Sequence, residues 1–366
     1  MIIKDIKVTN FTQPIPPILR KRVKGEQVIS LVRVIGEDGL EGHAMARANG
    51  GTSGDVLGEV ITRTLKRVVV EQDAFNREKI WQLMWRQVQI SYIPIFALSA
   101  VDVAVWDLAG KATGLPVRRL LGGYRESIPA YASSAFLDEP AEYLDDAQMA
   151  VKAGVLAYKI HPFQDAGRDM ELCRQLRRSL GPGVKLMLDV GGTYDRAESL
   201  RVGRLVEELG FVWYEEPLPH YDIQGYAELS RDLDIPVIGA ETVPGGVYAT
   251  ALYLRANAMD MVLCDTYWRG GITGMLKTAH LCEAMGVKIV SHHGGSPLMN
   301  LANLHVLCSI PNADYVEVLV PEKDYTYGIK SVSLVDEKGN AWAPDSPGLG
   351  AEIDWDYIEN HTASEL

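Results

Sequence analysis

Short apolar runs that end on a polar residue recur through the second half of the chain. The stretch FVWYEEPLP (211–219) ends its apolar run on Glu215 and Glu216. KLMLD ends on Asp189, and IPVIGAE ends on Glu241. Glu215 follows Asp189 by 26 residues, and Glu241 follows Glu215 by another 26. Three acidic residues therefore stand at the ends of three buried-type strands, one helix-length connection apart.

The same period extends in both directions. Five further positions belong to it: Ser133, Lys159 with His161, Asp265, His292 and Glu317. Parallel strands need crossover connections of a dozen or more residues, which are usually helical. Eight such strand ends predict an α/β chain with a (β/α)8-type barrel, in which functional residues lie at the carboxyl ends of the strands.

The residues before this period predict a separate α+β domain. Residues 2–10 alternate like a strand, and a proline-rich loop follows from residue 11. Two strands flank Asp38-Gly39, a dipeptide typical of a tight hairpin. A loop at 48–54 precedes helical patterns at 56–70, 77–88 and 97–113.

The chain divides into three predicted parts. We expect an α+β capping domain at 1–125, a barrel at 126–320 and a C-terminal segment at 321–366. Within that segment, residues 331–344 suggest a hairpin, and the last six residues, HTASEL, suggest a frayed tail.

Composition narrows the class of protein. The 366 residues suggest about two domains. A net charge of −12 argues against nucleic acid or an anionic membrane as partner, since both favour a basic surface. No apolar run approaches the roughly 18–20 residues of a membrane span, and the N-terminus lacks a signal-peptide pattern. The four scattered cysteines favour reduced core residues and a cytoplasmic protein.

Asp189, Glu215 and Glu241 offer only hard oxygen ligands. If they converge at a barrel mouth, they cannot all stay ionised without a cation. Such a set suits one Mg²⁺, with room left for water and substrate. The alternative is that the three carboxylates lie in separate salt bridges. Glu216 is expected to face away from them, because neighbouring strand residues point to opposite sides.

Basic residues occupy two other strand ends. Lys159 and His161 are two apart, so both can face the barrel mouth with Asp189. Asp265 and His292 end neighbouring strands, and a carboxylate beside an imidazole fixes its tautomer, as a general base requires. The two clusters could remove a proton from one face of a carbon and return one to the other. Structural roles for both histidines are the alternative.

Two further strand ends complete the candidate site. Glu317 could donate a hydrogen bond to a developing oxyanion if its neighbours raised its pKa. Ser133 could bind the substrate carboxylate from the first strand. The site would then take a small-molecule carboxylic acid.

These motifs resemble the enolase superfamily, and within it the mandelate racemase subgroup (mandelate racemase/muconate lactonizing enzyme-like). The likeness spans nearly the whole chain and rests on SAVDVAVWDLAGKATGLPVRRLLGG, LMLD, WYEEPLP, GAET, DTYWRGGITG, SHHGGSP and PGLGAEIDWD. It implies a (β/α)7β barrel with a capping domain that the C-terminal segment completes. It also implies a Mg²⁺ site at Asp189, Glu215 and Glu241 and a catalytic dyad of Asp265 and His292.

By the same similarity, Glu317 stabilises an enediolate and Lys159 is electropositive near the substrate carboxylate. The muconate lactonizing pattern places a lysine on the sixth strand, where this chain has Asp265. Two positions depart from the mandelate racemase pattern. Lys-x-Lys on the second strand is replaced by Lys159-Ile160-His161, and Asp-x-Asn on the third by Asp189-Val190-Gly191.

The expected reaction is Mg²⁺-dependent removal of the proton α to a carboxylate, followed by dehydration of a sugar acid to a 2-keto-3-deoxy acid. Racemisation or epimerisation of a 2-hydroxy acid is the close alternative, and it requires an active His161. Two more distant hypotheses are a non-catalytic metal-binding barrel and a metal-dependent aldolase. Homologous barrels commonly assemble, so a homo-oligomer is expected.

Four basic residues of the first loop bear on the substrate: Arg20, Lys21, Arg22 and Lys24. They favour a solvated basic loop. The alternative is that they meet a second substrate carboxylate, which would indicate a diacid.

Overall fold

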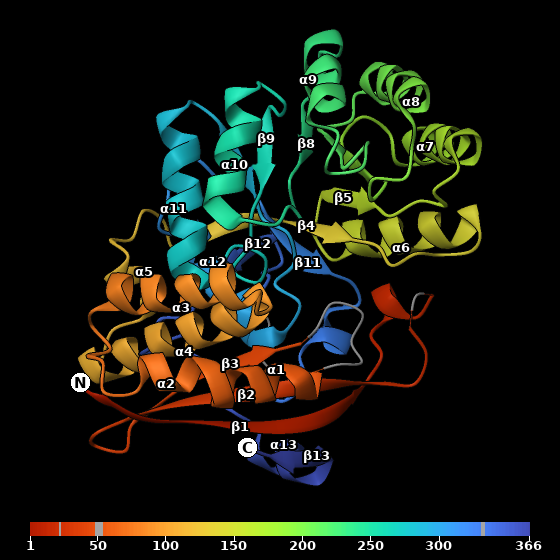
Figure 1. Cartoon of the computed structure of the whole chain (residues 1–366). Coiled ribbons are helices and arrows are strands. Elements are labelled where there is room, and N and C mark those ends of the chain that lie inside the picture. The colour runs from red at the N-terminus through yellow and green to blue at the C-terminus, as the bar shows by residue number, and fades with distance from the viewer. Residues whose placement is uncertain (22, 48–53, 331–333) are drawn as a thin grey trace.

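The computed structural model describes residues 1–21, 23–47, 54–330 and 334–366 (Figure 1). The predicted loop at 48–54 therefore lies almost entirely outside the described residues. Arg22 and residues 331–333 of the predicted C-terminal hairpin also lie outside them.

An antiparallel sheet holds the N-terminal part of the chain, below the barrel in Figure 1. The order is β13-β1-β2-β3, with bounds β1 (Ile3–Pro14), β2 (Glu26–Gly36), β3 (Glu41–Ala46) and β13 (Thr362–Glu365). The predicted hairpin is confirmed, because β2 and β3 pair on either side of Asp38-Gly39. The predicted end of the first strand at residue 10 is wrong. Phe11 and Gln13 are buried and pair with β2, so β1 continues to Pro14.

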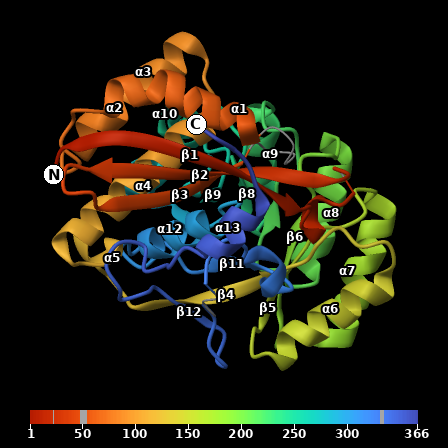
Figure 2. The same cartoon turned by 90° about the horizontal axis from the view of Figure 1, so that it is seen from below.

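Helices cover one side of this sheet and join it to the barrel (Figures 1 and 2). Their bounds are α1 (Gly54–Val60), a π-helical turn (Ile61–Leu65), α2 (Lys66–Val69), α3 (Arg77–Ser91), α4 (Ile95–Thr113) and α5 (Val117–Leu120). The predicted helical segments are thus confirmed. Helix α4 packs against β3 on one side and α11 on the other. A Cβ at Gly42 would lie 2.0 Å from the carbonyl oxygen of Ala104, so only glycine lets β3 approach α4 this closely.

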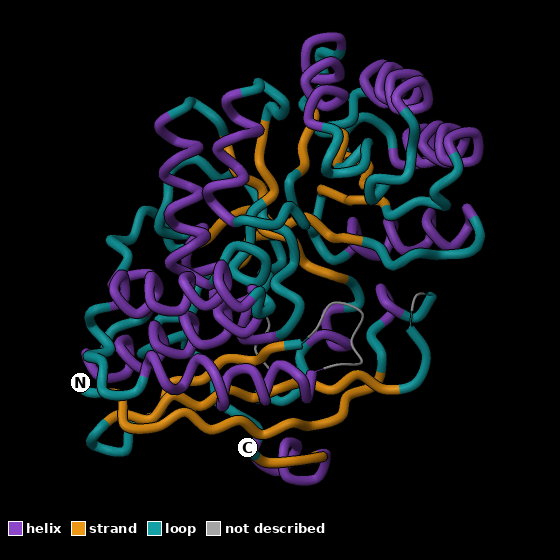
Figure 3. The backbone as a smooth tube through the Cα atoms, viewed as in Figure 1, coloured by secondary structure: helices purple, strands orange, loops and turns teal. Residues whose placement is uncertain are grey.

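Eight parallel strands form a nearly closed barrel surrounded by helices, which confirms the predicted fold class (Figure 3). The strands are β4 (Ser127–Ser133), β5 (Ala157–Ile160), β6 (Lys185–Asp189), β7 (Tyr214–Glu215), β8 (Val237–Gly239), β9 (Met261–Leu263), β10 (Lys288–Val290) and β11 (Val316–Leu319). The helices between them are α6 (Pro140–Lys152), α7 (Ala166–Leu180), α8 (Arg196–Glu208), α9 (Ile223–Asp232), α10 (Gly246–Arg255), α11 (Gly271–Ala284) and α12 (Pro297–Leu307). Among the described helices, none combines the length and apolar character that crossing a bilayer requires.

The barrel interior is a packed core. One layer of inward side chains comes from successive strands: Tyr131, Ala157, Met187, Trp213, Ile238, Leu263 and Val290. Because side chains alternate along a strand, residues two positions further on face the barrel mouth. Lys159, Asp189 and Glu215 occupy such positions.

Several strands are shorter than the apolar runs suggested. Glu241, Asp265 and His292 each lie two residues beyond the last residue of their strand, in the loop that follows. Glu317 lies inside β11 instead of at its end. The carboxyl-end location still holds for Glu241, Asp265 and His292, because their loops continue directly from the barrel strands.

The C-terminal segment returns to the antiparallel sheet. It contains a 3-10 turn (Glu322–Tyr325), β12 (Asn340–Trp342), α13 (Trp355–His361) and β13. Within the described part of the predicted hairpin, Val335 bridges Ala341. The expected frayed tail is wrong: β13 pairs with β1, and Leu366 exchanges backbone hydrogen bonds with Val8. The free edge of β1 supplies those partners.

Candidate active site

A cavity of about 170 Å³ lies where the carboxyl ends of the barrel strands face the N-terminal sheet domain. The N-terminal part contributes Ile18, Leu19 and Arg47. The barrel contributes Phe136, His161, Asp189, Gly191, Glu216, Glu241, Thr242, Trp268, His292, His293, Glu317 and Leu319. Five predicted site residues therefore share this cavity: His161, Asp189, Glu241, His292 and Glu317.

Lys159 lies beneath the cavity floor and is fully buried. Its Nζ is 2.6 Å from Glu215, 3.0 Å from Glu317 and 3.4 Å from Asp189. Burial alone would lower the pKa of Lys159, but the Glu215 and Glu317 carboxylates raise it well above its usual range. Lys159 is therefore a permanent positive charge at the centre of the barrel mouth.

His161 pairs with Asp189 on one side of the cavity. Its Nδ1 is 2.7 Å from the carbonyl oxygen of Ser134, to which it donates, and its Nε2 is 3.0 Å from Asp189. The His161 ring therefore connects the residue after β4 to the Asp189 carboxylate. Burial alone would raise the pKa of Asp189, but Lys159 and His161 hold it well below its usual range.

His292 makes a matching arrangement with Glu241 and Asp265. Its Nδ1 is 2.8 Å from Asp265, and its Nε2 is 3.1 Å from Glu241. Burial alone would lower the pKa of His292, yet these two carboxylates raise it to about 10. Asp265 is 1% exposed and also accepts the backbone N–H of Trp268 at 2.5 Å, so its orientation is fixed. The geometry brings together the two residues expected to form the dyad.

Glu317 could donate a hydrogen bond to an oxyanion only if its pKa were raised, and the structure does not meet this condition. Burial alone would raise its pKa, but Lys159 and the nearby histidines hold the pKa of Glu317 at about 2. It accepts the backbone N–H of His293 at 2.5 Å and pairs with Lys159. Glu317 is thus an ionised acceptor in this structure.

Glu216 is a cavity residue that the alternation argument placed on the wrong side. The strand ends at Glu215, and Glu216 adopts a left-handed φ of 45°, so the two side chains do not alternate. Its Oε1 accepts the backbone N–H of Glu241 at 3.0 Å. Burial and the Glu241 carboxylate raise the pKa of Glu216 to about 8. The proline that follows this pair was the available signal that the strand stops here.

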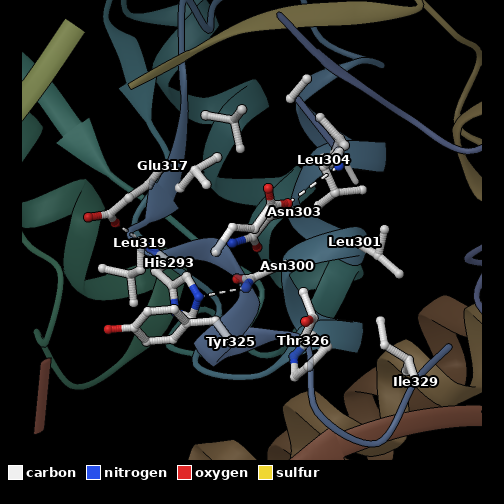
Figure 4. A pocket seen from close by; sticks show the side chains of 16 residues that line it. His293, Asn300, Leu301, Asn303, Leu304, Glu317, Leu319, Tyr325, Thr326 and Ile329 are labelled. Carbon is white, nitrogen blue, oxygen red and sulfur yellow. Dashed lines mark hydrogen bonds between the residues drawn. The ribbon is translucent and has the colours of Figure 1, made fainter. Parts of the chain in front are cut away.

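Ser133 is fully buried in β4 and does not belong to the cavity lining, so the predicted contact with substrate has no support in this geometry. His293 lines this cavity and also a smaller one behind β11, of about 40 Å³, where it approaches Asn300 (Figure 4). Burial lowers the pKa of His293 to about 3, so this histidine is neutral.

The carboxylates fit a hard divalent cation by their chemistry. The described residues contain no preformed cluster of three ligating side chains, because each candidate carboxylate turns toward a basic partner. Burial raises the pKa of Glu215, as does Asp189, against the effect of Lys159. A cation would relieve this crowding of like charge.

Two family models together cover most of the chain. The model for the mandelate racemase / muconate lactonizing enzyme N-terminal domain matches residues 4–122. The enolase C-terminal domain-like model matches residues 142–357.

Individual relatives are enzymes that act on sugar acids or their lactones. Arabinonate dehydratase from Saccharolobus solfataricus is 28% identical over 326 residues, 86% of each chain. D-galactarolactone cycloisomerase from Agrobacterium fabrum is 31% identical over 306 residues, 79% of this chain and 81% of the relative. The crystal structure of D-glucarate dehydratase from Agrobacterium tumefaciens complexed with magnesium superposes with a TM-score of 0.89 at 32% identity, covering 100% of both chains.

Proposed function

The chain belongs to the enolase superfamily, in its mandelate racemase/muconate lactonizing enzyme group, as its motifs predicted, and from this premise we propose a Mg²⁺-dependent sugar-acid dehydratase. The enzyme would remove the proton α to the substrate carboxylate. The β-hydroxyl then leaves as water after protonation, and the resulting enol tautomerises to a 2-keto-3-deoxy acid. Related enzymes are lyases and isomerases, so both reaction types are within the family's chemistry.

The observation that carries this proposal is the orientation of the His292 imidazole. Asp265 holds its Nδ1–H, which leaves Nε2, on the side of Glu241, as the nitrogen that exchanges a proton. A base oriented in this way can take the α-proton and later protonate the departing hydroxyl. Lys159 supplies a fixed positive charge beneath the reacting carboxylate.

We propose that Asp189, Glu215 and Glu241 hold one Mg²⁺ per chain, in line with the magnesium complex of the glucarate dehydratase relative. When bound, the ion would neutralise these carboxylates and the charge that develops on the substrate carboxylate. Glu317 orients Lys159 as an ionised acceptor, instead of acting as the donor predicted from the sequence.

Epimerisation is the second candidate, and the placement of His161 favours it. His161 Nε2 faces Asp189 while His292 Nε2 faces Glu241, so two imidazoles flank the cavity. A proton removed by one could be returned by the other. Dehydration takes precedence because two of the relatives described above are sugar-acid dehydratases. A cytoplasmic location and a homo-oligomer stay as predictions from the sequence.

The test is a panel of sugar acids with Mg²⁺, scored for 2-keto acid. We expect one or more acids to be dehydrated and His292→Asn to lower kcat by at least ~10³-fold, because the variant cannot exchange the proton. His280→Asn, on the exposed side of α11, is the matched control and should keep full turnover. Full turnover by His292→Asn would overturn the assignment of the base.

A further inference from the structure

Arg47 is a cavity residue to which neither the sequence nor the proposed reaction assigns a role. It directly follows β3 in the N-terminal sheet and is 8% exposed. It lines the same cavity as Asp189 and Glu241, from the opposite part of the chain. Among the described lining residues, it is the one with a permanent positive charge.

The guanidinium of Arg47 is held in one orientation by the barrel. Its Nε donates to the carbonyl oxygen of Gly295 at 2.6 Å, in the loop after β10. Its charged end lies 5.5 Å from the ring centre of Tyr267, whose hydroxyl donates to the Arg47 carbonyl oxygen. A Cβ at Gly295 would come within 2.9 Å of Arg47 Nε, so the fit leaves no spare room. The side chain is preorganised.

The Arg47 guanidinium has one terminal nitrogen that no described residue binds. Arg47 Nη1 is buried and has no hydrogen-bond partner among the described residues. No carboxylate in the described part of the chain lies within ion-pair distance of Arg47 either, whereas buried Lys159 lies within that distance of three. A buried charge without a partner is costly, so such a group is expected to be completed by a ligand.

The described basic residues of the first loop, unlike Arg47, do not place a positive charge in the cavity. Arg20, Lys21 and Lys24 are exposed and absent from the cavity lining. Lys21 pairs with Asp138 at 2.6 Å, and Arg20 Nε donates to its own loop at Ile15. The expectation of a solvated loop is therefore supported for these three residues.

We propose that Arg47 binds a second carboxylate at the far end of the substrate, so that the sugar acid is an aldaric acid, a diacid. This inference rests on the proposed function and specifies its substrate class. Arginine binds carboxylates through paired N–H donors, and a buried site rejects an analogue that leaves those donors empty. Apolar Ile18, Leu19 and Leu319 line the same cavity and exclude water from the ion pair.

The test compares matched acids that differ only at the terminal carbon. Galactarate and glucarate, with galactonate and gluconate, are assayed with the Mg²⁺-loaded wild type, Arg47→Met, Arg47→Lys and Arg20→Met. We expect the wild type to prefer at least one diacid over its matched monoacid, in kcat/KM, by roughly 30-fold or more. In Arg47→Met that ratio should fall to near one, and Arg47→Lys should recover part of it. Arg20→Met, an exposed arginine of the same domain, should keep the wild-type ratio.

Each preference is the ratio of the kcat/KM values for two substrates, measured on one enzyme preparation. The fraction of folded enzyme enters both values and cancels, so a partly misfolded variant still reports its preference. Wild-type enzyme that dehydrates monoacids as well as diacids, or Arg47→Met that keeps the preference, would overturn the inference and leave the dehydratase assignment standing. Absence of any product or α-proton exchange from all four acids would overturn both.

Discussion

Each carboxylate proposed for the metal is held by a basic side chain. The pairs are Asp189 with His161, Glu215 with Lys159, and Glu241 with His292. A divalent cation would compete with all three cationic partners. The His292 imidazole would then lose the Glu241 carboxylate, which helps to raise its pKa, and would lie near a dication instead.

Mg²⁺ binding should therefore release protons. At pH 8 we expect about one proton or more per ion, because the pKa of His292 falls from its metal-free value of about 10. Calorimetry in buffers of different ionisation enthalpy measures this number directly. His292→Asn should release fewer protons than the wild type, and equal heats in all buffers would argue against these pairs.

The sequence predicted most residues at the barrel mouth because their positions follow from a regular period. It missed Glu216 and Arg47 for physical reasons. Glu216 depends on a left-handed backbone turn that ends the strand, which alternation cannot foresee. Arg47 reaches the cavity only through the packing of β3 against the loop after β10, a contact between residues 248 positions apart.

At the scale of elements, the joint between α4 and α11 fixes the sheet domain against the barrel. Asp102 on α4 accepts the backbone N–H of Thr273, in the first turn of α11, at 2.9 Å. Burial raises the pKa of Asp102 to about 7, although Thr273 and Arg77 oppose the shift. A carboxylate near a helix N-terminus is a favourable acceptor, but this one is completely desolvated.

The free energy of unfolding should therefore depend on the ionisation of Asp102. Between its unfolded pKa of about 3.8 and its folded pKa of about 7, the native state holds a proton that the unfolded state has released. Stability contributed by this group thus falls as pH rises through that window, by up to roughly 4 kcal/mol.

Denaturant titrations at pH 5 and pH 8 measure this effect. Asp102→Asn should lose less stability between the two pH values than the wild type does. Asp145→Asn, on the exposed face of α6, should follow the wild type. An unchanged pH dependence in Asp102→Asn would show that Asp102 is ionised throughout.

Strand and helix types were predictable because hydrophobic periods differ between them. The residues at which the strands end were less predictable. The apolar runs before Glu241, Asp265 and His292 continue past the ends of the strands. The residues just beyond those ends stay buried, namely Ala240, Cys264 and Ser291. A hydrophobic run indicates burial and not strand pairing. At these three strand ends, the buried residues extend beyond the paired ones.

At the scale of the whole molecule, the two ends of the chain meet in one sheet. Strand β13 pairs with β1, and Leu366 bonds to Val8, yet these last residues are exposed. Deletion of residues 362–366 should lower the free energy of unfolding by about 1–2 kcal/mol through lost backbone hydrogen bonds. Because none of the deleted residues lines the cavity, kcat should change little. Thermal unfolding with an activity assay checks both, and an unchanged melting temperature would contradict the contribution.

The barrel was predictable at this scale from its eightfold repeat, and the match of the enolase C-terminal domain-like model to residues 142–357 agrees with it. The cavity was not, because it forms between a barrel with a strong sequence period and a sheet domain without one. Substrate selection depends on that junction, where Ile18, Leu19 and Arg47 meet the strand ends.

The most direct test of the central claim follows the α-hydrogen of a sugar acid in D₂O by NMR, using the Mg²⁺-loaded wild type and His292→Asn. We predict that the wild type forms a 2-keto acid carrying deuterium at C3, and that the variant forms almost none. Deuterium at the α-carbon without keto acid would make the enzyme an epimerase and bring His161 into the reaction. Wild-type enzyme that neither exchanges the α-hydrogen nor forms keto acid from any sugar acid would contradict the account.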